Sequence, residues 1–268
     1  MIDDRFAQWT DALKGRLLGQ PAYGWHQKSK GQRFLLNGLE FWAQLSVFAT
    51  HKESQDFIQR TKDKDRLFLK APTVHHIYWI DQYHVGCLMT FIPSSPFSNH
   101  ILLQPDAVVT PAFFADLARS LLNLSKASSK YISCTQELIT QRLNTYYPQQ
   151  TLTTKITSWA TIHGDMHWAN LTKNGTMLDW ETWGQGPRDL DPAFLYAFSI
   201  QSDETQHNIR RSFPTLFNTQ DGQLCLLFAC AEFVHMVKQY GDHADLLPQV
   251  TLLANTTLLQ LKQNAVSP

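Results

Sequence analysis

The sequence predicts an α+β chain with two lobes, a small N-terminal lobe built on an antiparallel sheet with one main helix and a larger, mostly α-helical C-terminal lobe. Two observations carry this prediction. Strand-like runs separated by turn signals are concentrated in the first third of the chain, and amphipathic helical patterns dominate after the Pro93-Ser94-Ser95-Pro96 segment. We therefore expect a lobe of residues 1–92 and a lobe of residues 93–268.

Composition favours a globular protein with a small-molecule partner. Hydrophobic residues make up 43% of the 268 residues and charged residues 17%, which is enough apolar surface to form a core. Lys plus Arg and Asp plus Glu both number 23, so the strong positive field of a non-specific nucleic-acid binder is absent. We expect no nucleic-acid partner. The sequence carries no indication of the oligomeric state.

Several features predict a cytoplasmic protein with reduced thiols. The cysteines contain no Cys-x-x-Cys pair, which favours buried, unpaired thiols; they are Cys87, Cys134, Cys225 and Cys230. The N-terminus has no basic segment followed by an apolar run, so no secretory signal is expected. The most apolar window, Leu224 to Val237, contains Glu232 and His235 and is too short for a bilayer. It predicts a buried helix, and we expect no membrane association.

The N-terminal lobe is expected to begin with a helix around Asp4 to Leu18. Strand character from Tyr23 to Val47 is interrupted at Lys30-Gly31 and at Asn37-Gly38, and the second of these pairs favours a tight hairpin turn. A polar helix is expected at Glu53–Lys64. Two further strands, 77–80 and 85–91, are expected to join near Asp81-Gln82.

The C-terminal lobe is expected to consist mainly of helices. Thr110-Pro111 is a helix cap followed by proline at the first helical position, and Phe113, Leu117 and Leu121 give that helix an apolar face. Further helices are expected at about 135–146, 151–159, 192–201, 222–240 and 246–263. Between them, residues 161–188 form a non-helical segment with the densest group of His, Asp, Asn, Glu and Trp in the chain. We expect the chemistry there.

Asn174-Gly175 predicts a two-residue type I′ hairpin within this segment, because both central positions of that turn need positive φ. Two strands would flank the turn, and counting outward places Asn170 opposite Asp179. Opposed residues project to the same face of a ribbon, so an amide oxygen and a carboxylate would lie side by side. Mg²⁺ prefers such oxygen ligands together with water and nucleotide phosphates. Asn170 and Asp179 are therefore the predicted metal ligands.

Asp165 lies five positions before Asn170, on the loop that enters the hairpin. This places it to address a substrate hydroxyl in front of a metal-bound phosphate. Phosphoryl transfer depends mainly on positioning and electrostatic stabilisation, with an aspartate that orients the hydroxyl and accepts its proton. Asp165 is the predicted catalytic base. The alternative is that Asp165 and Asp179 merely cap nearby backbone amides.

Two segments resemble the aminoglycoside phosphotransferase and choline kinase family. They are Ile162-His163-Gly164-Asp165-Met166-His167-Trp168-Ala169-Asn170 and Leu178-Asp179-Trp180-Glu181. The order of base, asparagine and later aspartate is also that of protein kinases. The resemblance implies a protein-kinase-like fold, ATP or GTP as co-substrate, Mg²⁺, and a small-molecule hydroxyl acceptor. The sequence of residues 167–172 is especially similar to that of bacterial kinases of peptide antibiotics such as viomycin and capreomycin. This similarity implies an antibiotic-resistance activity.

The same resemblance assigns supporting residues. Asp191, in the segment after the metal aspartate, is expected to brace the catalytic loop, and His163 is the other residue expected to brace it. Residues 88–93 look like the hinge strand that binds the adenine ring, which implicates Met89, Thr90 and Phe91 in nucleotide binding. Zinc ligation by His163 and His167 is the alternative for these histidines, but Gly164 and the loop context argue against the helix that such a pair needs.

The resemblance is weaker around the nucleotide phosphates. Residues 29–33, including Gly31, are the candidate phosphate-covering loop, although glycine is scarce in them. On the third strand, where the family places a Lys or Arg, this sequence offers only Gln44. A neutral amide lacks the charge that makes such hydrogen bonds about twice as strong. Either Lys52 or Lys30 substitutes, or nucleotide binding is weak.

The acceptor is expected to carry an amino group. His167, Glu181 and Trp183 are the candidate substrate contacts, although tryptophans in such a segment more often pack than bind. Carboxylates could bind a cationic substrate; besides Glu181 they are Glu232, Asp242 and Asp245. For each of these carboxylates, a solvated surface position is the alternative.

Three functions remain open from the sequence. The first is an active small-molecule kinase. The second is a pseudokinase that binds nucleotide without transfer, which Gln44 and the glycine-poor loop favour. The third is a metal-dependent phosphoesterase, which the Gly164-Asp165-Met166-His167 run superficially resembles. Such enzymes need further His and Asp blocks to hold two metals about 4 Å apart, and the sequence contains none.

Overall fold

The computed structural model describes residues 1–67, 69–148 and 153–266, and it divides into two compact units. Unit 1 comprises Met1–Ser95 together with Thr176–Glu181, and unit 2 comprises Pro96–Gly175 and Thr182–Pro268. The sequence placed Thr176–Glu181 in the second lobe. This segment instead belongs with unit 1, where the Met177 N–H donates to the carbonyl oxygen of Lys70 at 3.0 Å.

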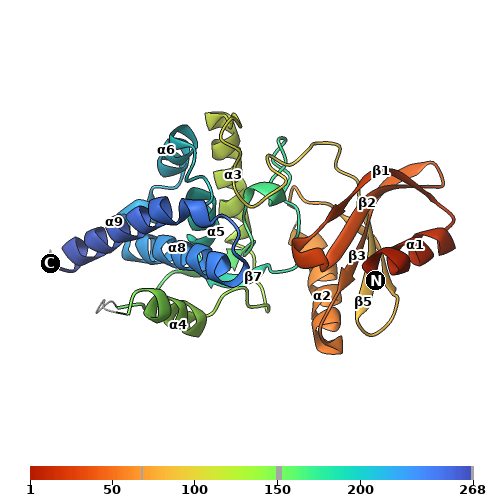
Figure 1. Cartoon of the computed structure of the whole chain (residues 1–268), viewed down its shortest axis with the longest axis horizontal. Helices are drawn as coiled ribbons and strands as arrows, with labels where there is room; N and C mark the ends of the chain where they lie inside the picture. The colour runs from red at the N-terminus through yellow and green to blue at the C-terminus, as the bar shows by residue number, and fades with distance from the viewer. Residues whose placement is uncertain (68, 149–152, 267–268) are drawn as a thin grey trace. The chain divides into compact units, whose positions relative to one another are not determined.

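Unit 1 is built on a five-stranded antiparallel sheet (Figure 1). Its strands are β1 (Arg16–Tyr23), β2 (Ser29–Leu36), β3 (Leu39–Val47), β4 (Val74–Trp79) and β5 (His84–Thr90), in the order β1-β2-β3-β5-β4. Two helices accompany the sheet, α1 (Ile2–Ala12) and α2 (His51–Lys64), and a short 3₁₀ turn, η2 (Asp65–Leu67), follows α2. The expected antiparallel sheet with one main helix is confirmed, and the helix expected at the start of the chain is present as α1.

The two helices pack on two different apolar clusters of the sheet. Phe6 and Trp9 of α1 bury the cluster that contains Phe34, Leu45 and Leu88. A second cluster joins α2 to β5 through Phe57, Ile58, Val85 and Cys87. Neighbouring positions of a strand point to opposite faces, so Cys87 and Leu88 contribute to different clusters. The sheet is therefore apolar on both faces.

The two turns that connect β1, β2 and β3 were predicted with different success. Asn37 and Gly38 have φ of 51° and 79°, so the predicted tight hairpin between β2 and β3 is confirmed. The predicted break at Lys30-Gly31 is wrong, because both residues lie inside β2. The connection between β1 and β2 is residues 24–28, which contains the 3₁₀ turn η1 (Trp25–Gln27).

The first helix is shorter than expected. It ends at Ala12, and residues 16–18 already belong to β1. A Cβ at Gly15 would lie 2.2 Å from the Phe34 ring, so the chain passes closely over the sheet at this point. Lys14 beside it has φ of 57°, outside the helical region. Tertiary contact with the sheet therefore overrides the helical pattern.

Unit 2 consists mainly of helices with a small two-stranded sheet (Figure 1). The helices are α3 (Pro111–Leu124), α4 (Gln136–Tyr146), α5 (Leu190–Ala197), α6 (Asp203–Ser212), α7 (Thr215–Asn218), α8 (Gln220–Tyr240) and α9 (Leu247–Val266), with the 3₁₀ turns η3 (Trp168–Asn170) and η4 (Ala244–Leu246). The sheet pairs β6 (Trp159–Ile162) with β7 (Gly184–Pro187). The long helix α8 is buried along most of its length and forms the centre of this unit.

Most expected helices of this unit are present, and two differences stand out. The helix expected at 151–159 is wrong over the described residues: 153–158 are irregular and Trp159 begins β6, while 151 and 152 lie outside the described residues. Helices α6 and α7 were not expected. Ser202 caps α6 by accepting the Thr205 N–H, a local signal that could have identified that helix.

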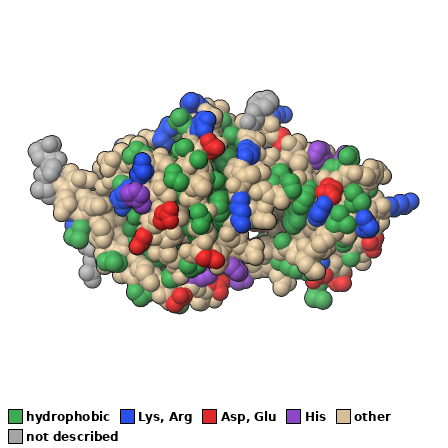
Figure 2. All heavy atoms as spheres, turned by 90° about the horizontal axis from the view of Figure 1, so that it is seen from above, with side chains coloured by type: hydrophobic (Ala, Val, Ile, Leu, Met, Phe, Trp, Pro, Cys, Tyr) green, Lys and Arg blue, Asp and Glu red, His purple; other side chains and the backbone are tan. Residues whose placement is uncertain are grey.

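The described residues contain no helix with the length and apolar character needed to cross a membrane. Acidic and basic side chains are interspersed over the face drawn in Figure 2, in keeping with the equal numbers of the two signs. All four cysteines are buried and unpaired, which confirms the prediction of buried thiols.

Candidate active site

The loop after β6 carries the predicted base. Antiparallel pairing of Ile162 with Gly184 ends β6 immediately before this loop. Gly164 has φ of +86°, and a Cβ there would lie 1.9 Å from the Ser133 hydroxyl oxygen. Both the backbone conformation and the lack of space require glycine at this position. The turn before Asp165 therefore depends on glycine at position 164.

Asp191 on α5 binds the same loop. Its Oδ2 accepts the His163 N–H and its Oδ1 accepts the Gly164 N–H, each at 2.8 Å, and the residue is only 2% exposed. Burial raises the pKa of this carboxyl, and the nearby His163 and the two backbone N–H groups counteract only part of that effect. Asp191 thus satisfies two buried donors and holds the start of the loop.

Asp165 lies among groups that favour its charged form. Asn170 Nδ2 donates to the main-chain oxygen of Asp165 at 2.9 Å and to its Oδ2 at 3.2 Å. His167 Nε2 lies 3.5 Å from the same carboxylate oxygen, and the Asp165 side chain is 41% exposed. Burial on its own raises the pKa of Asp165, but His167, His163 and the Asn170 amide outweigh it and hold the pKa below its usual value. The carboxylate is therefore ionised at neutral pH.

The amide of Asn170 is oriented by these contacts. The main-chain oxygen and Oδ2 of Asp165 are both acceptors, so the Asn170 side-chain atom that faces them is the amide nitrogen. This nitrogen also lies 3.1 Å from His167 Nε2. The nitrogen's donors are thereby engaged, and the amide oxygen is the atom left to meet a cation. A hard oxygen donor of this kind fits Mg²⁺. Asn170 belongs to η3, not to a strand.

The predicted hairpin around Asn174-Gly175 is wrong. Gly175 has φ of 80° and donates its N–H to Thr172 O at 2.8 Å, while Asn174 is not among the residues with positive φ. Lys173 and Asn174 are therefore the centre of the turn, and no strand occurs between β6 and β7 in the described part of the chain. Thr172 pairs with Pro96 instead, and its hydroxyl donates to Asn174 Oδ1 at 2.7 Å. These contacts replace the expected ribbon.

Asp179 lies in the segment that belongs to unit 1, as does the exposed Glu181. Asp179 has φ of 55°, a left-handed conformation that costs a non-glycine residue about 1–3 kcal/mol. The Trp180 indole N–H donates to Met177 O at 2.8 Å, and this hydrogen bond closes a turn of the chain that contains Asp179. Carboxylate oxygen is again a donor that suits Mg²⁺.

The predicted nucleotide contacts lie on the sheet of unit 1. Gly31 pairs with Gln44, Gln44 with Cys87, and Trp42 with Met89, so Gly31, Gln44 and Met89 share one face. Thr90 is the next residue after Met89, so its side chain lies on the other face. The Phe91 ring lies 4.8 Å from the Arg33 guanidinium. Residues 29–33 form part of β2, so the expected covering loop is wrong, and residues 24–28 make that connection.

Lys30 does not replace the missing cation at Gln44. It pairs across the sheet with Leu45, a member of the α1 cluster. Its ammonium lies 2.6 Å from Asp3 Oδ1 and 5.0 Å from the centre of the Phe6 ring. It therefore lies on the face opposite Gln44 and is already paired. Gln44 itself donates to the Ser46 hydroxyl at 3.3 Å, and Lys52 is an exposed residue at the start of α2.

The residues predicted to contact the acceptor differ in burial and in their partners. His167 lies beside the base, as described above. Trp183 is 2% exposed and packs edge-on against Tyr131 with ring centres 5.2 Å apart, so its ring is a packing surface. Glu232 is engaged by Arg142 of α4. Asp242 and Asp245 are exposed. A free carboxylate for a cationic substrate is thus not supplied by Glu232.

Ser133 was missed by the sequence reasoning. Its hydroxyl oxygen is buried without a hydrogen-bond partner, against Gly164. The residue reaches this place because its N–H donates to Gln185 O of β7 at 2.8 Å. Such a contact joins distant parts of the chain, and no local pattern in the sequence announces it.

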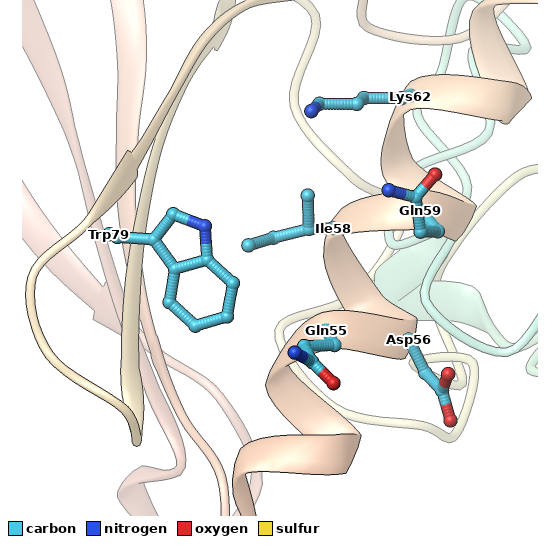
Figure 3. A pocket seen from close by; sticks show the side chains of 6 residues that line it. All are labelled: Gln55, Asp56, Ile58, Gln59, Lys62 and Trp79. Carbon is cyan, nitrogen blue, oxygen red and sulfur yellow. The ribbon is translucent and has the colours of Figure 1, made fainter.

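Two surface cavities are lined by other residues. One of 440 Å³ on unit 1 is lined by Gln55, Asp56, Ile58, Gln59, Lys62 and Trp79, with the indole facing Ile58 of α2 (Figure 3). Another of 410 Å³ on unit 2 is lined by residues that include Asp189, Arg188 and Asp221. Neither includes a predicted site residue. Across the described residues, no group of three or more His, Cys, Asp or Glu side chains is placed to hold a metal.

Comparison with known proteins identifies the fold. No family model matches the sequence, and no curated protein matches it. Aminoglycoside phosphotransferase APH(4)-Ia is similar in structure, with a TM-score of 0.65 and 10% identity over 96% of this chain and 99% of that one. Aminoglycoside phosphotransferase APH(3'')-Id from Streptomyces rimosus gives a TM-score of 0.60 with 13% identity over 86% and 98% of the two chains. A putative aminoglycoside phosphotransferase from Ralstonia eutropha gives 0.57 with 12% identity over 97% and 98%. The chain therefore has the protein-kinase-like fold of the aminoglycoside phosphotransferases.

Proposed function

We propose that this protein is a phosphotransferase that moves the γ-phosphoryl group of ATP or GTP onto a hydroxyl group of a small molecule. The observation that carries the proposal is the arrangement around Asp165, whose carboxylate is ionised and accessible on a loop held by Asp191. A base on a rigid loop is what the reaction requires, because transfer depends on positioning more than on covalent chemistry.

Asp165 would accept a hydrogen bond from the acceptor hydroxyl and then its proton. The hydroxyl oxygen forms a bond to the γ-phosphorus while the bond from that phosphorus to the β,γ-bridging oxygen breaks. The products are a phosphate ester and the nucleoside diphosphate, and the proton remains on the Asp165 carboxyl until solvent takes it up. The lowered pKa of Asp165 keeps the base unprotonated before each turnover.

Asn170 and Asp179 are the proposed Mg²⁺ ligands. The amide oxygen of Asn170 is left available by the contacts of its nitrogen, and both side chains offer hard oxygen atoms. The ion would supply charge neutralisation of the phosphate oxygens. The assignment of Asp179 rests on the sequence order of base, asparagine and aspartate.

The nucleotide is proposed to bind to the sheet face that carries Gly31, Gln44 and Met89. The backbone of residues 89–91 would then bind the purine ring of the nucleotide. Structures of APH(4)-Ia in complex with AMP-PNP or ADP and hygromycin B share the fold, with TM-scores of 0.63 and 0.64. These complexes support a nucleotide co-substrate and a small-molecule acceptor for this chain. Amino-bearing acceptors such as aminoglycosides, peptide antibiotics, amino-sugars or choline-like molecules are the proposed class.

A pseudokinase is the second candidate. Gln44 donates to Ser46 and carries no charge, and Lys30 lies on the opposite face of the sheet in a pair with Asp3. Weak binding of the α and β phosphates follows from this arrangement. A nucleotide-binding protein without transfer would show the same features.

The deciding experiment incubates the protein with Mg²⁺, ATP or GTP, and a panel of these acceptors, and scores acceptors by a mass gain of one phosphate. Asp165→Asn is expected to lower turnover by about 10²- to 10⁴-fold with little change in nucleotide affinity. Asp106→Asn, at an exposed position, is the matched control and should leave both unchanged. Turnover retained by Asp165→Asn would remove the base. Nucleotide binding without any phosphorylated product would favour the pseudokinase.

A further inference from the structure

Lys64, the last residue of α2, is buried, although lysine ordinarily lies at the surface. Its side chain is 4% exposed, and its ammonium lies 2.9 Å from Asp65 Oδ1. The ammonium also donates to the carbonyl oxygen of Pro72. A buried charge persists only where it is paired and hydrogen-bonded, so these contacts are specific. None of the roles described so far uses Lys64.

These contacts tie the connection between α2 and β4 to the end of the helix. The other carboxylate oxygen of Asp65 accepts the Val74 N–H at 3.1 Å, at the start of β4. Within the connection, the Ala71 N–H donates to Leu69 O at 2.9 Å, so the chain turns tightly at Lys70. Lys64 and Asp65 thus hold the residues that follow this turn, Pro72 and Val74, against the end of α2.

That turn anchors the segment that contains Asp179. The carbonyl oxygen of Lys70 accepts the Met177 N–H at 3.0 Å, and Met177 is fully buried. The carbonyl oxygen of Met177 in turn accepts the Trp180 indole N–H at 2.8 Å. Both backbone polar groups of Met177 are therefore engaged, and Asp179 lies between the two anchored residues in its left-handed conformation.

We infer that Lys64 and Trp180 are positioning residues for Asp179: Lys64 fixes the turn that binds Met177, and the Trp180 indole fixes the chain on the other side of the aspartate. This inference rests on the proposed function in treating Asp179 as a metal ligand. A strained residue keeps its conformation only when its surroundings over-determine it. Loss of either anchor lets Asp179 relax, so that metal affinity falls while the nucleotide face of the sheet is unchanged.

The test uses the full chain and two variants that remove one donor each. Lys64→Met keeps the length of the side chain and removes the ammonium, and Trp180→Phe keeps an aromatic ring and removes the indole N–H. Lys62→Met, on the exposed face of the same helix, and Trp79→Phe, at a half-exposed ring of unit 1, are the matched controls. Asp179→Asn is the reference for loss of the ligand.

The first measurement is hydrogen exchange of the Met177 amide, with peptides from α8 as the internal standard. Lys64→Met should raise its exchange rate by about 10-fold or more without a matching change in α8, because the tie to Lys70 becomes loose. The second is Mn²⁺ binding in the presence of ADP, followed by electron paramagnetic resonance. Both donor variants should weaken Mn²⁺ binding by about 3- to 10-fold, toward the value for Asp179→Asn, while metal-free ADP affinity stays constant.

The readouts separate this inference from the proposed function. Unchanged exchange at Met177 in Lys64→Met, or faster exchange with unchanged Mn²⁺ affinity, would overturn the positioning role. A wild-type protein that binds no Mn²⁺ with ADP would overturn it too. Mn²⁺ binding that depends on Asp179, Lys64 and Trp180 in a protein that phosphorylates no acceptor would support the inference and count against transfer. A parallel loss of Mn²⁺ binding in the controls would also count against it.

Discussion

The Oδ1 atom of Asp191 accepts the main-chain N–H of Gly164 at 2.8 Å, across a sequence separation of 27 residues. The other oxygen accepts the next N–H toward the N-terminus, that of His163. A buried donor left without its acceptor costs about 1–3 kcal/mol. The start of the candidate catalytic loop therefore depends on one carboxylate from α5.

Asp191→Ala should lower the free energy of unfolding by about 2–5 kcal/mol, because two buried N–H groups lose their acceptor and a cavity remains. Any transfer activity should fall further than stability explains. Asp191→Asn keeps one acceptor oxygen and should have an intermediate effect. Urea denaturation and kcat for the three proteins check this, with Asp106→Ala as the surface control. A loss in Asp191→Ala no larger than that in Asp106→Ala would contradict the role.

Gln44→Lys should strengthen nucleotide binding if nucleotide binds on the face that carries Gly31 and Met89. A cation there supplies the charge-assisted phosphate contact that the amide lacks, and we expect the Kd for Mg-ATP to fall by about 3- to 10-fold. Titration calorimetry measures the change. Gln59→Lys, the same change at an exposed position of α2, is the control. An unchanged or weaker affinity in Gln44→Lys alone would place the nucleotide elsewhere.

Gly164→Ala should destabilise the protein by about 2–4 kcal/mol, since the new Cβ would lie 1.9 Å from Ser133 Oγ in a backbone conformation of φ +86°. Removing the obstacle in Ser133→Gly/Gly164→Ala should recover part of the loss, because steric conflict is relieved while backbone strain remains. A double-mutant cycle by thermal and urea denaturation measures this coupling. Strict additivity of the two changes would show that Ser133 is not the obstacle.

Asp189 gives stability a defined pH dependence. Burial raises the pKa of Asp189 above its ordinary 3.8 and Asp221 adds to this, while Thr215 and Arg188 oppose it. The folded state then binds a proton at pH values where the unfolded state has released it, so stability falls as the pH rises from 3.8 to the folded pKa. The slope from one group is at most about 1.4 kcal/mol per pH unit.

Asp189→Asn should lack this slope and therefore gain stability relative to the wild type as the pH rises through that interval. Thr215→Val removes the hydroxyl that donates to Asp189 Oδ1 at 2.7 Å, so it should extend the interval to higher pH. Urea denaturation at intervals from about pH 4 to about pH 7 tests both variants. Parallel stability curves for the wild type and Asp189→Asn would refute the shift.

Local signals in the sequence identified much of the architecture. Asn37-Gly38 predicts its turn because asparagine and glycine tolerate positive φ, and Thr110-Pro111 predicts the start of α3 because the threonine accepts the Phe113 N–H. The sheet of unit 1 and the long helix α8 follow from period-two and helical apolar patterns. Each of these features is determined by residues close together in the chain, so the sequence alone is sufficient for them.

Signals of the same kind failed where distant contacts are stronger. Asn174-Gly175 resembles Asn37-Gly38, yet Thr172 pairs with Pro96, and the turn shifts by one residue. The first helix ends early because Gly15 passes over Phe34, and Lys30 is lost as a phosphate contact because strand register places it against Asp3. Local preferences amount to about 1 kcal/mol per residue, which packing and register readily exceed.

The sequence by itself determined the residue types of the candidate site: a carboxylate, an amide and a second carboxylate in a fixed order, with glycine before the first. Only the tertiary structure decided what holds them. Asp191 reaches back to the loop, Ser133 limits Gly164, and Lys64 with the Lys70 turn anchors the segment of Asp179. The chemical type of each site residue can be read directly from the sequence. The supporting hydrogen bonds and contacts join segments that meet only after the chain has folded.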